Sequence, residues 1–171
     1  VEAPPGYFSQ VFEAVRSAGG LVIADEVQAG FCRTGKWWGF AHDEAVPDIV
    51  TLGKPMGGGH PPAAVVTTPA IAALFAGGAG YFNTFGGNPV SAAVGKAVIE
   101  VIEREELEAS VARVGAYTRA GLESLGDKFE LIGDVRGRGL FLSVDLVADC
   151  ALKTAAAYID HRRAKLMIRD G

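Results

Sequence analysis

Residues 21–26 read LVIADE, a run of four apolar residues followed at once by two acidic ones. A short continuous apolar run is typical of a strand that is buried on both faces of a sheet. Residues 48–54 read DIVTLGK, a second short strand that runs into Gly53-Lys54. Ligands of open α/β sheets bind beyond the carboxyl ends of the strands, so Asp25 and Lys54 are expected to face a common crevice if both strands share one sheet. From position alone, a structural ion pair is the better-supported interpretation.

The remaining pattern predicts an α/β fold. Apolar residues at helical spacing predict a helix that begins near Tyr7 and ends before Gly19-Gly20. A third strand is expected at residues 63–66, followed by a short helix at 69–75. Asn88-Pro89 is a strong signal for the start of a long helix, which we expect to kink near residues 105–108 and to continue to about residue 125.

The pattern changes beyond Gly126. Strands are predicted at residues 129–132 and 140–146, joined by a polar, glycine-punctuated connection at 133–139. A helix over 152–163 and a terminal strand over 166–169 complete the prediction. We place a domain boundary near residue 105, so that residues 1–105 form part of a large, mainly parallel domain and residues 106–171 form part of a smaller α+β domain.

Composition excludes several classes of protein. Of 171 residues, 49% are hydrophobic and 21% are charged, which is the balance of an ordered globular chain. The net charge of −4 and the lack of a basic patch argue against a nucleic-acid binder. No apolar run reaches the roughly 20 residues that a membrane span needs.

Cys32 and Cys150 lie far apart, which favours free thiols in a reducing compartment, and we predict a cytoplasmic protein. The three histidines show no metal-ligand spacing, so no metal site is predicted.

Three motifs change the weight given to Asp25 and Lys54. They are IADEVQAGF with RTG at residues 23–35, PDIVTLGK followed by GGG at 47–59, and FNTFGGNP at 82–89. In this order and with these gaps, the chain resembles the class III aminotransferases, which are pyridoxal-phosphate enzymes. IGDVRGRGLF at 132–141 is similar to the small domain of that family, so the resemblance covers nearly the whole chain. It implies part of the large pyridoxal-phosphate domain of the aspartate-aminotransferase type, plus part of the small domain.

The resemblance implies a role for each matching residue. Lys54 would form the Schiff base with the aldehyde of pyridoxal 5'-phosphate and, once freed, would move a proton. Asp25 would keep the pyridine nitrogen protonated, Gln28 would bind the phenolic oxygen, and Val27 would pack on one face of the ring. Thr84 would bind the phosphate of the neighbouring subunit's cofactor, which implies a homodimer. The substrates would be an amine and a keto acid or aldehyde.

The resemblance also leaves alternatives open. Relatives are more than twice as long, and neither a Gly/Ser-rich phosphate cradle nor a ring-stacking aromatic precedes Asp25, so we expect the chain to be a fragment. The residues around Lys54 are similar to those of the phospho-lyases that act on phosphorylated amino alcohols such as ethanolamine phosphate, and elimination of this kind is the alternative to amino transfer. The alanine–glyoxylate aminotransferase branch of the family is also similar. A second alternative is an inactive fragment or interaction module. Cys32 stands where the family often has glycine, a change that either alters the loop or leaves a reactive thiol.

Overall fold

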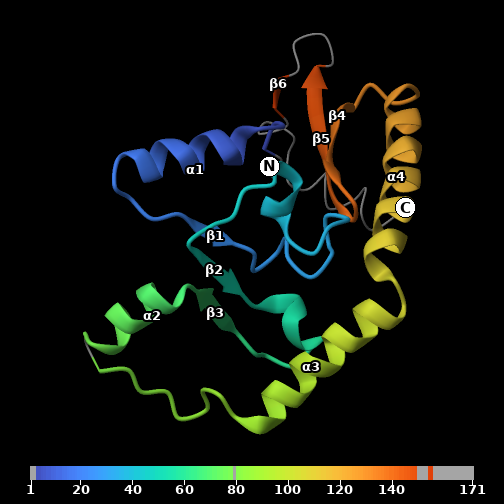
Figure 1. The fold of residues 1–171 in the computed structure, drawn as a ribbon. Coiled ribbons are helices and arrows are strands. Elements are labelled where there is room, and N and C mark those ends of the chain that lie inside the picture. Colours follow the sequence, from blue (N-terminus) through green and yellow to red (C-terminus); the bar gives the residue numbers. More distant parts are fainter. Residues whose placement is uncertain (1–2, 79, 150–153, 156–171) are drawn as a thin grey trace.

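The computed structural model describes residues 3–78, 80–149 and 154–155 (Figure 1). Two small sheets are joined by a long pair of helices. The helices are α1 (Tyr7–Ser17), α2 (Pro69–Ala76), α3 (Pro89–Arg104) and α4 (Leu107–Gly126), with short 3-10 turns η1 (Gly39–Asp43) and η2 (Lys54–Gly57). The strands are β1 (Ile23–Asp25), β2 (Ile49–Leu52), β3 (Ala64–Thr67), β4 (Ile132–Arg138), β5 (Phe141–Asp149) and β6 (Thr154–Ala155). None of the described helices is long and apolar enough to cross a membrane.

The first sheet has the order β1-β2-β3 and carries the two polar strand ends of interest. Strand β1 pairs parallel with β2, whereas β3 pairs antiparallel with β2. The carboxylate of Asp48, just before β2, accepts a hydrogen bond from the backbone N–H of Val22 at 2.8 Å. It also forms an ion pair with Arg16 of α1 at 3.0 Å. These contacts hold α1 beside the start of β1 and β2.

A small core lies between α1 and the loop before β2. Phe12, Val22 and Ala45 are buried there, and Phe8 and Phe40 pack against them. Burial of β1 on both faces was predicted and is not found, because the Ile23 side chain is 61% exposed. Strand β1 is the edge of its sheet in the described part of the chain, so α1 covers the start of the strand while Ile23 stays open to solvent.

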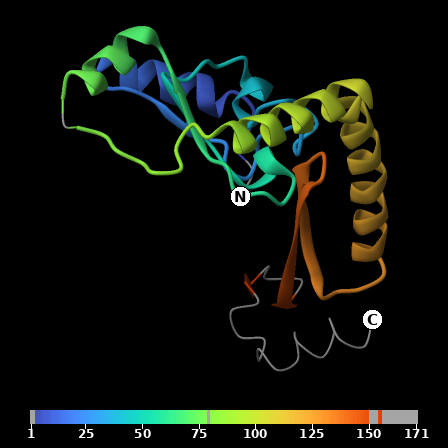
Figure 2. The same cartoon turned by 90° about the horizontal axis from the view of Figure 1, so that it is seen from below.

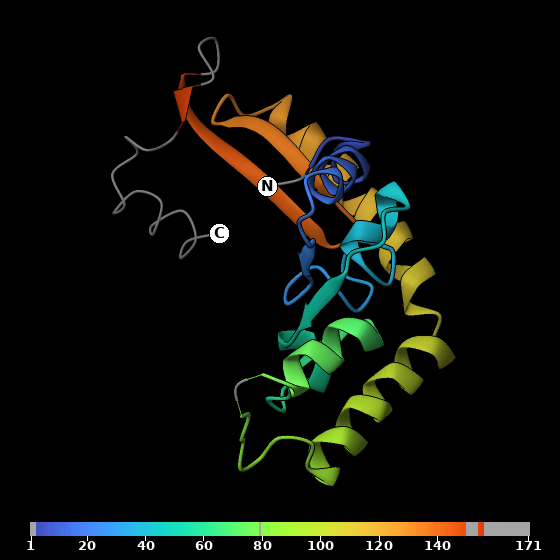
Figure 3. The same cartoon turned by 60° about the vertical axis from the view of Figure 1, so that its left-hand side comes forward.

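The long helix breaks where the sequence predicts a kink. Asn88 caps α3 by accepting a hydrogen bond from the Ser91 N–H (2.8 Å), and α3 ends at Arg104. Glu106 then takes a left-handed backbone conformation with φ of 49°, which redirects the chain into α4. Figures 2 and 3 show the sharp bend between the two helices, with β4 and β5 lying beside α4.

The second sheet corrects part of the sequence prediction. Residues 133–139 were expected to connect two strands, but most of them form β4, which pairs antiparallel with the long β5. The polar residues are accommodated because one face of this hairpin is open, and Arg136 forms an ion pair with Asp145 across it. Thr154–Ala155 pair with β5 as β6, where a helix was predicted. The rest of the predicted helix and the strand at 166–169 lie outside the described residues.

Helix α4 lies against the turn between β4 and β5 at two glycines. A Cβ atom at Gly115 would overlap the backbone of Gly139, and a Cβ at Gly139 would come within 2.6 Å of the Gly35 nitrogen. The turn is also tied to the first half of the chain, since the Leu140 N–H donates to the Arg33 carbonyl at 2.9 Å. This contact therefore depends on backbones that approach without side chains between them.

We expect Gly115→Ala to destabilise the fold by about 1–3 kcal/mol, because the added methyl group forces the Gly139 turn away from α4. Gly121→Ala in the same helix is the matched control, since nothing lies within 4 Å of an added Cβ there. That control should stabilise the protein by about 0.5–1 kcal/mol through helix propensity. Chemical denaturation measures both values. Equal effects of the two substitutions would contradict the proposed close contact.

Cys32 is fully enclosed, with 1% of its surface exposed. Burial, followed by the nearby Glu108 carboxylate, raises the pKa of its thiol from 9.0 to about 11. The thiolate is the reactive form of cysteine, so burial and the raised pKa argue against one of the two alternatives, a reactive thiol at Cys32. The alternative, an altered loop, remains compatible with the positive φ of Cys32 (66°).

We expect native Cys32 to resist alkylation at pH 8. A pKa raised from 9.0 to about 11 leaves roughly a hundredfold less thiolate than in the unfolded chain, and burial slows the reaction further. Mass-spectrometric mapping of iodoacetamide adducts, with and without denaturant, measures this residue separately from Cys150. Labelling of Cys32 at the same rate in both conditions would show that the side chain is accessible.

Candidate active site at the ends of β1 and β2

The parallel pairing of β1 and β2 brings their carboxyl ends to one edge of the sheet. The register places Asp25 opposite Thr51, three residues before Lys54. The Glu26 N–H extends the pairing by donating to the Thr51 carbonyl at 3.0 Å. The predicted common crevice for Asp25 and Lys54 therefore has the required strand arrangement.

Asp25 is held by two hydrogen bonds to one carboxylate oxygen. Oδ1 accepts from the Val27 N–H at 3.0 Å and from the Thr51 hydroxyl at 3.2 Å. The first bond closes an Asx turn that leads the chain away from the strand. These two bonds fix the orientation of the carboxylate, and Oδ2 is not used by either of them. Asp25 itself is exposed to solvent. Thr51 was not predicted as a site residue, although its place opposite Asp25 follows once the two strands are paired in this register.

Lys54 lies next to Gln28 and not in an ion pair with Asp25. Its Nζ donates a hydrogen bond to Gln28 Oε1 at 3.2 Å. Val27 packs beside the same segment, because a Cβ at Gly53 would meet Val27 Cγ1 at an ordinary contact distance of 3.5 Å. The structure thus brings together four of the five predicted site residues, Asp25, Val27, Gln28 and Lys54. The Asp25–Thr51 and Gln28–Lys54 hydrogen bonds together link the segment after β1 to the end of β2 and the residues that follow it.

The backbone at Lys54 is strained. Its φ of 31° lies on the positive side, which is uncommon for a residue with a side chain. Gly53 before it is extended, and Lys54 begins the short turn η2 with Pro55 at the next position. A conformation of this kind persists only where surrounding contacts hold it, and such residues cluster at functional sites.

Glu26, which follows Asp25, has a structural role. Its side chain is 3% exposed and accepts hydrogen bonds from the N–H groups of Gly39 and Phe40 at 2.9 and 3.0 Å. These bonds fasten the start of η1 to the turn after β1. Trp38 stacks on Phe40 in the same loop, with ring planes 9° apart. The long irregular stretch after β1 is therefore anchored to the strand end.

Thr84 lies away from the other predicted residues. It occupies an exposed loop between α2 and α3, and in this chain it makes no hydrogen bond with Asp25, Gln28 or Lys54. Its neighbours are organised locally, since Asn83 Oδ1 accepts from the Phe85 N–H at 3.1 Å. Within this chain, Thr84 is therefore not linked by a hydrogen bond to the predicted site residues at the ends of β1 and β2.

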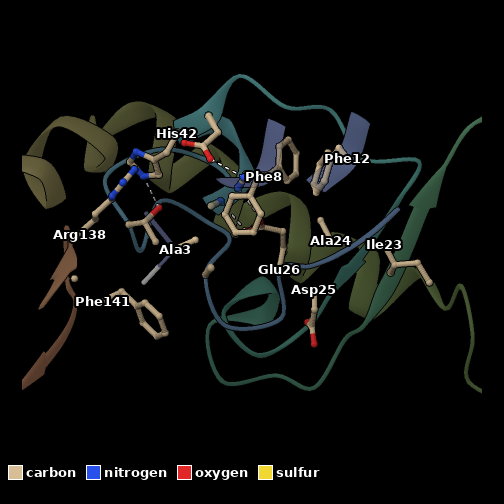
Figure 4. A pocket seen from close by; sticks show the side chains of 16 residues that line it. Ala3, Phe8, Phe12, Ile23, Ala24, Asp25, Glu26, His42, Arg138 and Phe141 are labelled. Carbon is tan, nitrogen blue, oxygen red and sulfur yellow. Dashed lines mark hydrogen bonds between the residues drawn. The ribbon is translucent and has the colours of Figure 1, made fainter. Parts of the chain in front are cut away.

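A separate cavity of about 210 Å³ borders Asp25 on the α1 side (Figure 4). Its walls come from α1, η1 and the start of β5, and neither Lys54 nor Gln28 is among its lining residues. The labelled side chains Phe8, Phe12 and Phe141 give it an apolar lining, while His42 bonds to Thr34 at 3.1 Å. This cavity therefore shares Asp25 with the candidate site but not Gln28 or Lys54.

Among the described residues, no three His, Cys, Asp or Glu side chains gather closely enough to hold a metal ion. The donor set at the strand ends suits an aldehyde-bearing pyridine cofactor. An amine, a carboxylate and an amide lie at one exposed edge, and they match an aldehyde carbon, a pyridinium nitrogen and a phenolic oxygen. The residues present therefore fit pyridoxal phosphate.

Comparison with known proteins identifies similar chains. Alanine–glyoxylate aminotransferase 2 homolog 2 of Arabidopsis thaliana is 56% identical over 91% of this chain and 32% of its own length. A phospholyase from Arthrobacter, solved with phosphoethanolamine, superposes with a TM-score of 0.84 at 45% identity, over 91% of this chain and 37% of its own. A Bacillus anthracis aminotransferase gives a TM-score of 0.85 at 36% identity, over 95% and 37%. The chain spans about a third of the length of these relatives.

The cytoplasmic prediction is wrong by this comparison, since the Arabidopsis relative is a mitochondrial protein by name. The prediction was based on two free cysteines. Free thiols indicate a reducing environment, and they do not distinguish one reducing compartment from another.

The family itself follows from the extent of the match. The fold neighbours include transaminases that cover more than nine-tenths of this chain. The family description "Aminotransferase class-III" matches residues 1–168, which include both sheets and the edge where Asp25, Gln28 and Lys54 meet. The chain belongs to the class III aminotransferase family.

Proposed function

We propose that this chain carries the cofactor-attachment region of a pyridoxal-phosphate-dependent aminotransferase. The observation that carries the proposal is the meeting of Asp25, Gln28 and Lys54 at one edge of the first sheet, with Lys54 Nζ 3.2 Å from Gln28 Oε1. The class III family membership of the chain agrees with it. When bound, the cofactor would supply an electron sink that stabilises negative charge on the substrate carbon.

The residues of this chain then take distinct roles. Lys54 would hold the cofactor by its amine, which suits attachment to an aldehyde, and once released the same amine would move a proton at the substrate carbon. Asp25 would keep a proton on the pyridine nitrogen, and its Oδ2 is the oxygen left for that role because Oδ1 accepts from Val27 and Thr51. Gln28 keeps its amide N–H groups for the phenolic oxygen, since its Oε1 accepts from Lys54.

We propose that the protein works as a homodimer in which Thr84 reaches the neighbouring subunit's cofactor phosphate. Thr84 lies in an exposed loop and makes no hydrogen bond with Lys54 of its own chain. Large apolar side chains are exposed on the same loop and on α2, which is the character of a surface that another subunit covers. They are Leu74, Phe75, Tyr81, Phe82 and Phe85, with exposed fractions of 62–87%.

The domain division is also proposed. Residues 1–105 would belong to the large domain and residues 106–171 to the small domain. The break at Glu106 and the separate sheets on either side of the α3–α4 pair support this division.

The attachment of the cofactor is tested by reductive trapping. The complete gene product is incubated with pyridoxal phosphate, reduced with borohydride, and its labelled lysine is mapped by mass spectrometry. We expect the label on Lys54. Lys54→Ala should lower the trapped label by at least about tenfold, since the attachment amine is lost. Lys96→Ala, at an exposed position of α3, is the control and should keep it. Label spread over several lysines would contradict the proposal.

Amino transfer and phosphate elimination are then distinguished by product. The phospholyase structure with phosphoethanolamine favours the elimination as a second candidate, whereas the Arabidopsis relative favours amino transfer between alanine and glyoxylate. We expect glycine from glyoxylate in the presence of alanine, and Asp25→Asn to lower that rate by roughly 10²- to 10³-fold. Release of inorganic phosphate and ammonia from phosphoethanolamine, without glycine formation, would assign the protein to the phospho-lyases instead.

A further inference from the structure

The segment that follows Lys54 has little stiffness of its own. Residues 53–60 are held by short-range backbone turns, such as Met56 N–H to the Gly53 carbonyl at 2.9 Å and Gly58 N–H to the Pro55 carbonyl at 3.2 Å. Gly58 and Gly59 both have positive φ, and glycine gains the most freedom when such a turn opens. The strained φ of 31° at Lys54 therefore has to be maintained by contacts from outside this segment.

His60 provides such a contact. Its Nε2 lies 2.8 Å from the Ser91 hydroxyl oxygen, in a partly buried hydrogen bond between residues 31 positions apart. Ser91 stands in the first turn of α3. The turn η2 packs along the same helix (Figure 1), where a Cβ atom added at Gly95 would lie 3.8 Å from the Met56 carbonyl oxygen. The bond ties the end of the Lys54 segment to a rigid element.

Ser91 is itself part of the cap of α3. Asn88 Oδ1 accepts from the Ser91 N–H at 2.8 Å, while Asn88 Nδ2 donates to the Ser91 hydroxyl at 3.0 Å and to the Phe85 carbonyl at 2.7 Å. The Ser91 hydroxyl accepts from Asn88 and still has a proton to donate and a second lone pair, so it can bond to His60 Nε2 in either tautomer. The connected bonds run from the Lys54 segment to the residue next to Thr84.

The space between the two segments is not filled by side chains. An open hollow of about 690 Å³ lies there. Beside this hollow, the His60–Ser91 hydrogen bond adds a directed link to the packing of η2 against α3. The residues that border the hollow include Met56, His60, Asn83, Phe85, Asn88 and Ser91.

We propose that His60 is a positioning residue that holds the Lys54 segment in register with the Thr84 loop through Ser91 and Asn88. The inference rests on the proposed function, because Lys54 and Thr84 are the residues proposed to hold cofactor. In the proposed homodimer, Thr84 serves the partner's cofactor and Lys54 serves the cofactor of its own chain. The same hydrogen-bonded bridge would then position one residue in each of the two active sites.

Three substitutions in the complete gene product test the bridge. His60→Leu removes the hydrogen bond and keeps side-chain bulk, Ser91→Ala removes its other end, and His60→Gln retains a polar nitrogen at similar reach. Thr118→Ala is the matched control, since it removes a 2.8 Å hydroxyl bond to the Val114 carbonyl on α4, outside both segments. The readouts are cofactor affinity by absorbance titration and backbone hydrogen exchange over residues 53–60 and 83–87.

We expect His60→Leu and Ser91→Ala each to weaken cofactor binding by about five- to tenfold, the scale of one lost hydrogen bond. Exchange should accelerate in both segments, and the double variant should be no worse than either single one, because the two residues form one interaction. His60→Gln should restore binding to within about twofold, and Thr118→Ala should leave it unchanged.

Two outcomes would overturn the inference about His60. One is trapped label on Lys54 with wild-type cofactor affinity and wild-type exchange in His60→Leu. The other is a general loss of exchange protection that His60→Gln does not reverse, which would show a purely structural role. Failure of the proposed function is recognised separately, because the wild-type protein would then not concentrate the trapped label on Lys54.

Discussion

The parallel pairing of β1 with β2 is the constraint on which the candidate site depends. A register of Asp25 opposite Thr51 puts the carboxyl ends of two sequence-distant strands at one edge of the sheet. The Asp25–Thr51 and Gln28–Lys54 bonds then link the two segments that leave that edge. A slip of one residue would turn every side chain of β1 to the opposite face and separate the carboxylate from the lysine.

The loops around this edge are held by polar contacts directed at backbone groups. Glu26 fastens the loop after β1 by accepting hydrogen bonds from two backbone N–H groups. Asn88 fastens the loop before α3 by donating to the Phe85 carbonyl. A buried carboxylate is tolerated in this position because both of its oxygens are bonded. The core centred on Phe12 and Val22 is small. These hydrogen bonds therefore fix the positions of the loop residues around the site, which packing against that core alone would not do.

Much of the fold could be predicted because its signals are local. The Asn88-Pro89 helix start, the break near Glu105–Glu106 and strands β2 and β3 follow from capping residues and apolar runs. Strand β4 could not be predicted, since its polar and glycine residues are typical of a connection, and it forms because β5 offers a long partner. The exposure of Ile23 was not predicted for a related reason. An apolar run shows that a strand is suited to burial, but it does not show which element, if any, covers each face.

The sequence by itself determined the class of the protein, the order of its motifs and the identity of the charged strand ends, because these depend on residue type and spacing along the chain. Tertiary structure alone decided which groups meet. It paired Lys54 with Gln28 in place of Asp25, placed Thr51 on the Asp25 carboxylate, enclosed Cys32 and joined His60 to Ser91. The physical reason is that hydrogen-bond partners and burial are set by distances in space between segments that lie 26 to 31 residues apart in the chain.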